Sequence, residues 1–128
     1  RPTTLESEMD LSKFKAVDSI RVEIDHAGCE GVVFTVAGPS HPKTKAAERA
    51  RADALASRRK IKGDALKELA LQFVAARLLD WTGVEWDGEA LELTEENALR
   101  ILGSPDLGFI TDQILAAIGD DALLYKSN

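Results

Sequence analysis

The side chains best suited to chemistry in the first half of the chain are His26, Cys29 and His41. His26 and Cys29 stand three residues apart, which would suit one pair of ligands for a metal ion. Because metal sites need three or four ligands and no second close pair follows, the spacing does not predict one. A nucleophilic thiol would also need an oriented base, and no pattern supplies it. We interpret Cys29 as a small buried or half-buried thiol, and expect no metal and no cofactor.

Carboxylates crowd a later segment of the chain, at Glu85, Asp87, Glu89, Glu92, Glu95 and Glu96. Paired carboxylates can transfer protons or bind divalent ions. The spacing does not fit a calcium-binding loop, because residues 80, 82 and 84 do not supply its alternating oxygen ligands. The glycines are also too scattered to form a phosphate-binding loop. We therefore interpret the segment as a solvated acidic edge, and predict no catalytic residue and no enzymatic activity.

Charge is distributed unevenly over the 128 residues, whose net charge is −6. Residues 43–63 hold eight basic and two acidic side chains, whereas residues 64–128 hold four basic and thirteen acidic ones. This basic belt between acidic flanks favours head-to-tail association of copies or a charged partner. The other interpretation is a solvated helix face. We expect a homo-oligomer. The candidate residues for contacts between copies are Arg49, Arg51, Arg58 and Arg59.

The basic segment 43–62 also leaves open an alternative function, that of a nucleic-acid-binding regulator. Its Lys and Arg side chains could contact phosphates. It holds no aromatic residue on which bases could stack, and the acidic remainder would oppose a large footprint. Nucleic acid is therefore not the partner that we expect.

Length and composition predict one domain with an ordinary hydrophobic core. No apolar run approaches the ~20 residues that span a bilayer, so we expect no membrane association and a cytosolic location. A single cysteine fits a reducing compartment. We expect a flexible N-terminal segment over residues 1–16 and a single domain over residues 17–128.

The first half of that domain predicts a β-hairpin followed by a helix. Alternating residues over 19–26 indicate a strand with one buried face, and the β-rich run 32–37 a second strand after a glycine-containing turn. Residues 43–61 are rich in Ala, Arg and Lys and predict a helix that buries little.

The second half predicts mainly helices. The apolar segment 65–81 predicts the main buried helix, and residues 81–93 a short hairpin or structured loop. Thr94 and Ser104 are typical N-caps for two further helices, and Gly103 and Gly119 end them. Residues 120–128 are predicted to fray. The expected fold class is α+β, a mostly helical small domain with an N-terminal antiparallel β-hairpin.

Three short sequence motifs occur in a fixed order along the chain: Gly38-Pro39-Ser40-His41-Pro42, then Trp81-Thr82-Gly83-Val84 with Asp87-Gly88-Glu89, and Thr94-Glu95-Glu96-Asn97-Ala98. A fourth element, Phe109 to Leu115 running into Ile118-Gly119-Asp120, follows near the end. In order and spacing the set resembles the tail assembly chaperones of long-tailed bacteriophages (siphophages), over about residues 18 to 125.

The resemblance implies a non-enzymatic protein made in the host cytoplasm and absent from the mature virion. Such chaperones bind the tape measure protein, keep it soluble and help recruit the tail tube protein. Many are made in two lengths by programmed frameshifting, and the longer form contacts the tube protein. This chain would correspond to the short form. The remaining alternative is another phage tail or connector protein.

Apolar side chains of the predicted helices and of segment 81–93 are candidates for the partner surface: Leu71, Val74, Leu78, Trp86, Phe109 and Ile110. Tryptophan is enriched at protein interfaces, which favours Trp86. A small domain has few apolar groups to spare, so the core is the competing place for each of the six.

Overall fold

The computed structural model describes residues 10–57 and 63–127. A single 3-10 turn, Leu11–Lys13, precedes the first strand. The elements then follow in the order β1 (Phe14–Ala16), β2 (Ser19–Glu23), β3 (Val33–Ala37), α1 (Pro42–Ala56), α2 (Gly63–Arg77), β4 (Leu78–Thr82), β5 (Glu85–Trp86), β6 (Glu89–Ala90), α3 (Glu95–Leu102), α4 (Gly108–Ile118), α5 (Asp121–Leu124) and β7 (Tyr125–Ser127). The predicted α+β class, mostly helical with an antiparallel hairpin near the N-terminus, is confirmed.

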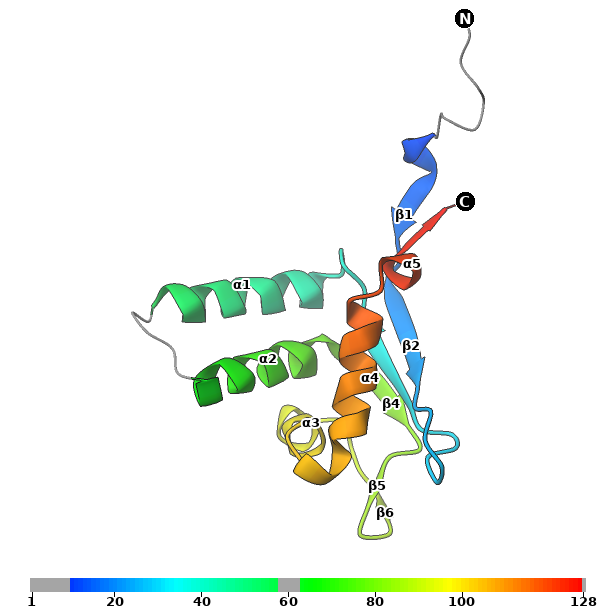
Figure 1. Ribbon diagram of the computed structural model, residues 1–128, viewed down its shortest axis with the longest axis vertical. Helices are drawn as coiled ribbons and strands as arrows, with labels where there is room; N and C mark the ends of the chain where they lie inside the picture. The colour runs from blue at the N-terminus through cyan, green and yellow to red at the C-terminus, as the bar shows by residue number, and fades with distance from the viewer. Residues whose placement is uncertain (1–9, 58–62, 128) are drawn as a thin grey trace, which may run out of the picture.

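The main sheet is antiparallel with the strand order β2-β3-β4, so β3 is central. The predicted hairpin is its first half, in which Ile20 lies opposite Val36 and Val22 opposite Phe34. These four side chains are buried and share the face that meets the helices. In Figure 1 the sheet forms one side of the molecule and α4 runs alongside its strands.

The prediction of one helix over residues 65–81 is wrong at its C-terminal end. Helix α2 stops at Arg77, and Leu78 begins the strand β4, which pairs with β3. Four of the five residues of β3 are buried, so this strand needs a neighbour on each side. Strand pairing and burial outweigh the modest helical preference of the segment.

A β-bulge explains why β4 looks helical in the sequence. Leu78 lies opposite Val36 and Trp81 opposite Phe34, so four residues of β4 match three of β3. The register shift leaves Leu79 as the extra residue and turns both Leu78 and Trp81 toward the core. A spacing of three is the signature of a helix face, and here it belongs to a bulged strand.

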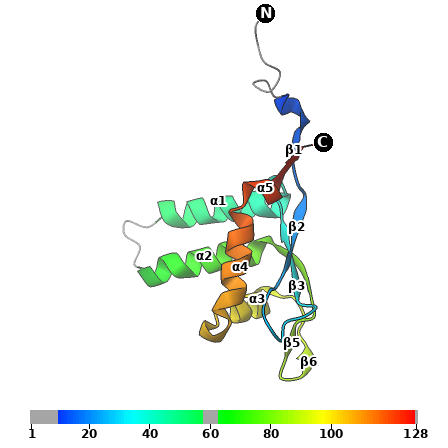
Figure 2. The ribbon, with the colours of Figure 1, turned by 45° about the vertical axis from the view of Figure 1, so that its right-hand side comes forward.

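Helices α1 and α2 form a hairpin that extends away from the sheet, side by side in both views (Figures 1 and 2). His41 caps α1, since its Nδ1 accepts a 3.0 Å hydrogen bond from the Lys43 amide, and Pro42 is the first helical residue. Only Thr44 and Ala47 of α1 are buried, as its alanine-rich sequence predicts. The last part of the predicted helix 43–61, residues 58–61, lies outside the described residues.

Helices α3 and α4 complete the core. The Thr94 hydroxyl accepts a 3.1 Å hydrogen bond from the Asn97 amide, which confirms the predicted N-cap of α3. Ser104 makes no such bond, and a 3-10 turn at Pro105–Leu107 precedes α4, so the prediction of a continuous helix from Ser104 is wrong. The largest fully buried apolar side chains are those of Phe34, Ile114, Val36 and Val74.

The two ends of the described chain are ordered against each other. Strand β1 pairs antiparallel with β7, with Phe14 opposite Ser127 and Ala16 opposite Tyr125. The fraying predicted for 120–128 is therefore wrong up to Ser127, and β1 lies within the segment predicted to be flexible. Neither segment has a strong apolar pattern of its own, so the sequence did not predict these strands. Each is stabilised by its hydrogen bonds to the other.

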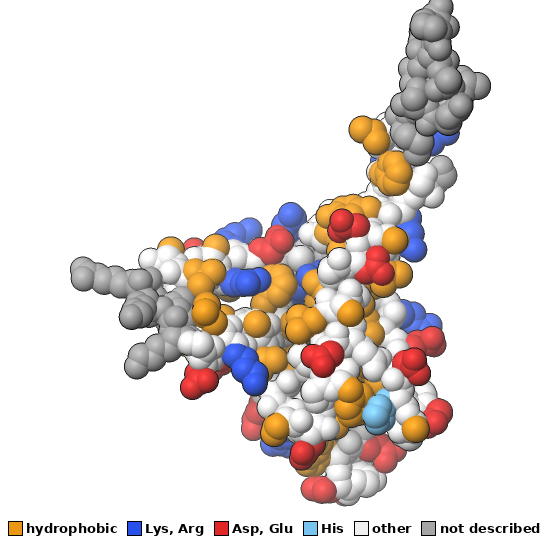
Figure 3. Space-filling model, in the orientation of Figure 1, with side chains coloured by type: hydrophobic (Ala, Val, Ile, Leu, Met, Phe, Trp, Pro, Cys, Tyr) orange, Lys and Arg blue, Asp and Glu red, His pale blue; other side chains and the backbone are white. Residues whose placement is uncertain are grey.

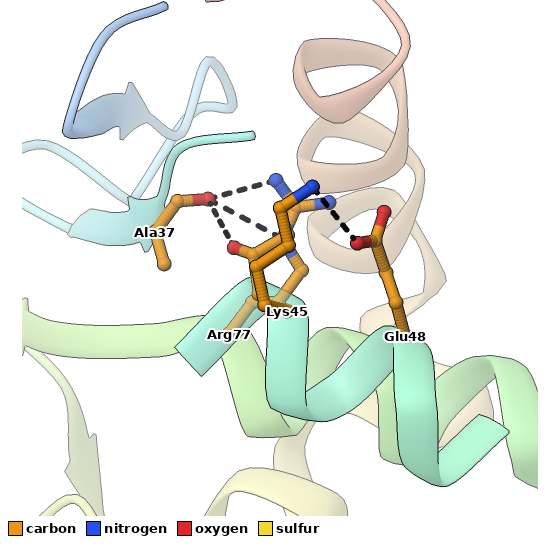
Figure 4. A network of polar contacts seen from close by, with 5 residues as sticks. Ala37, Lys45, Glu48 and Arg77 are labelled. Atoms are coloured by element: carbon orange, nitrogen blue, oxygen red, sulfur yellow. Dashed lines mark hydrogen bonds and ion pairs between the residues drawn. The ribbon is translucent and has the colours of Figure 1, made fainter. Parts of the chain in front are cut away.

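A buried polar contact attaches the helical hairpin to β3 (Figure 4). The Ala37 carbonyl oxygen accepts bonds from Thr44 Oγ1 at 3.2 Å and from Arg77 Nε and Nη2 at 3.3 and 2.7 Å. Burial lowers the pKa of the Arg77 guanidinium, and the negative charge of Glu48 opposes this shift. The contact connects α1, α2 and β3 at one atom, so it fixes where the hairpin leaves the sheet.

Candidate protein-binding groove

The site begins where β4 ends, at Gly83. Gly83 has a φ of +73°, and a side chain at this position would collide with the carbonyl group of Gly31. Glycine lets the loop after β4 lie directly against the turn that joins β2 to β3. Two segments about fifty residues apart in sequence therefore form adjoining walls.

Beyond Gly83 the chain forms the small hairpin β5–β6. Trp86 lies opposite Glu89, and the two-residue turn between them has positive φ values at Asp87 (53°) and Gly88 (82°). Asp-Gly with two positive φ values is typical of the tight turn that suits the twist of paired strands. Of the two structures predicted for residues 81–93, the hairpin is the one present.

Two contacts hold this hairpin against the body of the protein. In the first, Trp81 Nε1 donates a 2.8 Å hydrogen bond to the carbonyl of Leu91, whose own amide donates a 3.0 Å bond to the Val84 carbonyl across the open end of the hairpin. The guanidinium of Arg100 on α3 lies 5.9 Å from the centre of the Trp86 ring. Trp86 is thereby held at the surface, with 36% of its area exposed.

These segments surround an open hollow of about 440 Å³, here called the Trp86 groove. Its walls are the turn between β2 and β3 and the loop from β4 to β5, and its remaining lining comes from β3, α3, the turn before α4 and α4. The apolar lining residues are Cys29, Val32, Phe34, Val84, Trp86, Ile101, Leu107 and Ile110. A hollow of this size with an apolar floor is typical of a binding site.

The charged residues that line the groove are both acidic, Glu30 and Glu85. Backbone N–H groups of Glu30 itself and of Gly28 hold the pKa of the Glu30 carboxyl below its ordinary value, so this charge persists in mildly acidic solution. Residues 83–102 hold six acidic side chains and one basic, Arg100. Figure 3 shows acidic side chains gathered at the end of the molecule where β5 and β6 lie.

The structure brings Trp86 and Ile110 of the predicted partner surface together, since both line the groove. Phe109 precedes Ile110 in the sequence, is half-buried and stacks on His26, with ring centres 4.1 Å apart. Ile110 is 6% exposed, so it contributes to the groove as part of its floor.

The other three predicted partner residues do not lie at the groove. Leu71 is half-buried against the core, and Val74 and Leu78 are within it, 1% and 3% exposed. The sequence placed all three on one long helix, and the core was the alternative for each. Because α2 ends at Arg77, Leu78 belongs to a strand and does not share a helix face with Leu71 and Val74.

The arginines predicted to contact other copies lie on α1 or beyond it. Arg49 and Arg51 are exposed, and the Arg51 guanidinium lies 5.3 Å from the centre of the Phe73 ring on α2. Arg51 therefore already takes part in packing between the two helices. Arg58 and Arg59 lie outside the described residues.

The residues with metal-binding or nucleophilic chemistry have other surroundings. Cys29 is half-buried in the groove wall, and His41 caps α1. Over residues 10–57 and 63–127, no three His, Cys, Asp or Glu side chains are placed to hold a metal ion. In the same part of the chain, no helix combines the length and apolar character needed to cross a membrane.

Sequence reasoning missed most of the groove lining, including Cys29, Glu30, Val84 and Leu107. One signal was present: Gly83 and the Asp87-Gly88 turn bracket Val84 and Trp86, which predicts apolar side chains displayed on a tight hairpin. What faces that hairpin depends on the pairing of β4 with β3, and this pairing was not predicted.

Comparison of the chain with models of known protein families, with curated proteins and with solved structures finds no match.

Proposed function

We propose that this protein is a non-enzymatic tail assembly chaperone of a long-tailed bacteriophage. It binds the tape measure protein and keeps it soluble before the tail tube forms around it. It works in the host cytoplasm and is absent from the mature virion. A longer form made by programmed frameshifting would contact the tail tube protein.

The observation that carries the proposal is the Trp86 groove. The groove has an apolar floor and opens at the surface. Trp86, which is 36% exposed, lies on its rim. An unassembled helical protein exposes apolar stripes that promote aggregation, and a chaperone must offer a surface that covers them. The ordered sequence motifs on which the family resemblance depends support the same function independently.

The three motifs of the family resemblance also have clear structural roles in this chain. The first ends β3 and caps α1, the second ends β4 and places the β5–β6 hairpin, and the third caps α3. Two of the three border the groove or position its walls. The motif therefore supports the proposal through the shape that it produces, without any catalytic group.

Co-expression with the tape measure protein tests the proposal. We expect the tape measure protein to be insoluble alone and soluble with this chain, and the two to purify together. Mass spectrometry of purified virions should find the tape measure protein and not this chain. A tape measure protein that stays insoluble, or a chain that remains in the virion, would contradict the proposal; the second result would favour a connector protein.

A further inference from the structure

The charge and shape of the Trp86 groove restrict what it can bind. We propose that the groove takes a polypeptide segment whose apolar side chains are flanked by Lys or Arg. This rests on the proposed function and adds the chemistry of the recognised segment: apolar anchors for the floor and basic neighbours for the rim.

The floor calls for apolar anchors. Phe34, Ile101 and Ile110 border the hollow, and each is less than 7% exposed, so the floor is rigid core. Trp86 and Val84 form a more exposed rim on a hairpin. A volume of about 440 Å³ has room for large side chains, and their burial supplies most of the affinity.

The charges on the rim of the groove favour a partner with basic side chains. Glu30 and Glu85 stand on the two adjoining walls, and no Lys or Arg of residues 10–57 and 63–127 lines the groove. The Arg100 guanidinium, 5.9 Å from the centre of the Trp86 ring, forms an exposed ion pair with Glu96 at 3.9 Å. A segment with Lys or Arg beside its apolar side chains is complementary to this rim, whereas nucleic acid and anionic lipid are repelled.

The probe is a soluble helical peptide with leucines along one face and lysines on both sides of that stripe. In a matched peptide every lysine is replaced by glutamate, and in a second the leucines are replaced by serines. Chemical-shift mapping on the unaltered full-length protein should show binding of the first peptide, with the largest changes at Cys29, Val84 and Trp86. The glutamate and serine peptides should bind at least about tenfold more weakly.

Variants locate the interaction. Trp86→Ala should weaken binding of the lysine peptide at least about tenfold, whereas Trp86→Phe should retain most of it. The double variant Glu30→Gln/Glu85→Gln should weaken binding about threefold to tenfold and flatten its salt dependence. Asp121→Asn, at the end of the molecule remote from β5 and β6 (Figure 1), is the matched control and should bind as the unaltered protein does.

Several results would overturn the inference. They are equal binding of the lysine and glutamate peptides, shift changes away from the groove, or a folded Trp86→Ala variant that binds unchanged. Changes in the groove signals on dilution of the protein alone would assign the groove to a second copy, and would also overturn it.

Co-expression separates this inference from the proposed function. If the Trp86→Ala and glutamine variants solubilise the tape measure protein as well as the unaltered chain does, the groove assignment fails and the chaperone function stands. If the unaltered chain binds the lysine peptide and does not solubilise the tape measure protein, the chaperone function fails while the chemistry of the groove holds.

Discussion

At the scale of single residues, the two tryptophans have different environments and should respond differently to substitution. Trp81 is 8% exposed and meets Phe34 edge to face, with ring centres 5.8 Å apart, whereas Trp86 is 36% exposed. We expect Trp81→Ala to reduce the free energy of unfolding by about 3–5 kcal/mol. Trp86→Ala should change it by less than about 1 kcal/mol. Urea unfolding followed by circular dichroism measures both, and a reversed order would contradict the assignment of Trp86 to binding.

Glu30 predicts a pH dependence of stability. Its pKa is lowered from the ordinary value of 4.5 by backbone hydrogen bonds, so the folded state prefers the ionised carboxylate. The resulting stabilisation is complete above the unfolded-state pKa and is lost as the pH falls through the lower folded-state pKa. Glu30→Gln should be less stable than the unaltered protein at pH 7, and the difference should disappear in strongly acidic solution. Urea titrations at several pH values test this, and a difference independent of pH would contradict it.

At the scale of elements, the loop between β4 and β5 should depend on glycine more than the β5–β6 turn does. Gly83 and Gly88 both have positive φ, but only at Gly83 would an added side chain meet backbone, the carbonyl group of Gly31. Gly88→Ala should cost about 1–2 kcal/mol, the usual cost of a left-handed conformation. Gly83→Ala should cost more and should also weaken peptide binding, because the two walls must separate. Equal losses in unfolding experiments would show that the close approach to Gly31 is unimportant.

Elements whose signals are local could be predicted from the sequence. The hairpin of β2 and β3 follows from alternation and glycines, and α3 from the cap at Thr94. What could not be predicted depends on distant partners. Strand β4 has a helix-like spacing because of its bulge, and β1 and β7 exist only as a pair. Trp86 was recognised as a binding candidate from its residue type, whereas the opposite wall of its groove comes from the unpredicted sheet pairing.

At the scale of the whole molecule, charge is separated between two regions that lie apart. Described basic side chains of α1 include Lys43, Lys45 and Arg49, whereas the groove end is acidic. If copies associate through these regions, association is head-to-tail and need not close into a ring. Light scattering should then show a larger mass at low salt that falls as salt is added. A mass unaffected by salt and by dilution would exclude association driven by charge.

The bulge in β4 should let this strand lose one residue without losing its core contacts. Removing one residue from a strand normally turns every later side chain to the opposite face. Here Leu79 is the surplus residue, so its deletion would restore a regular ladder with Leu78 still opposite Val36 and Trp81 still opposite Phe34. A chain without Leu79 should therefore keep its core, whereas deletion of Thr82, the residue after Trp81, would shift the loop that leads to the groove.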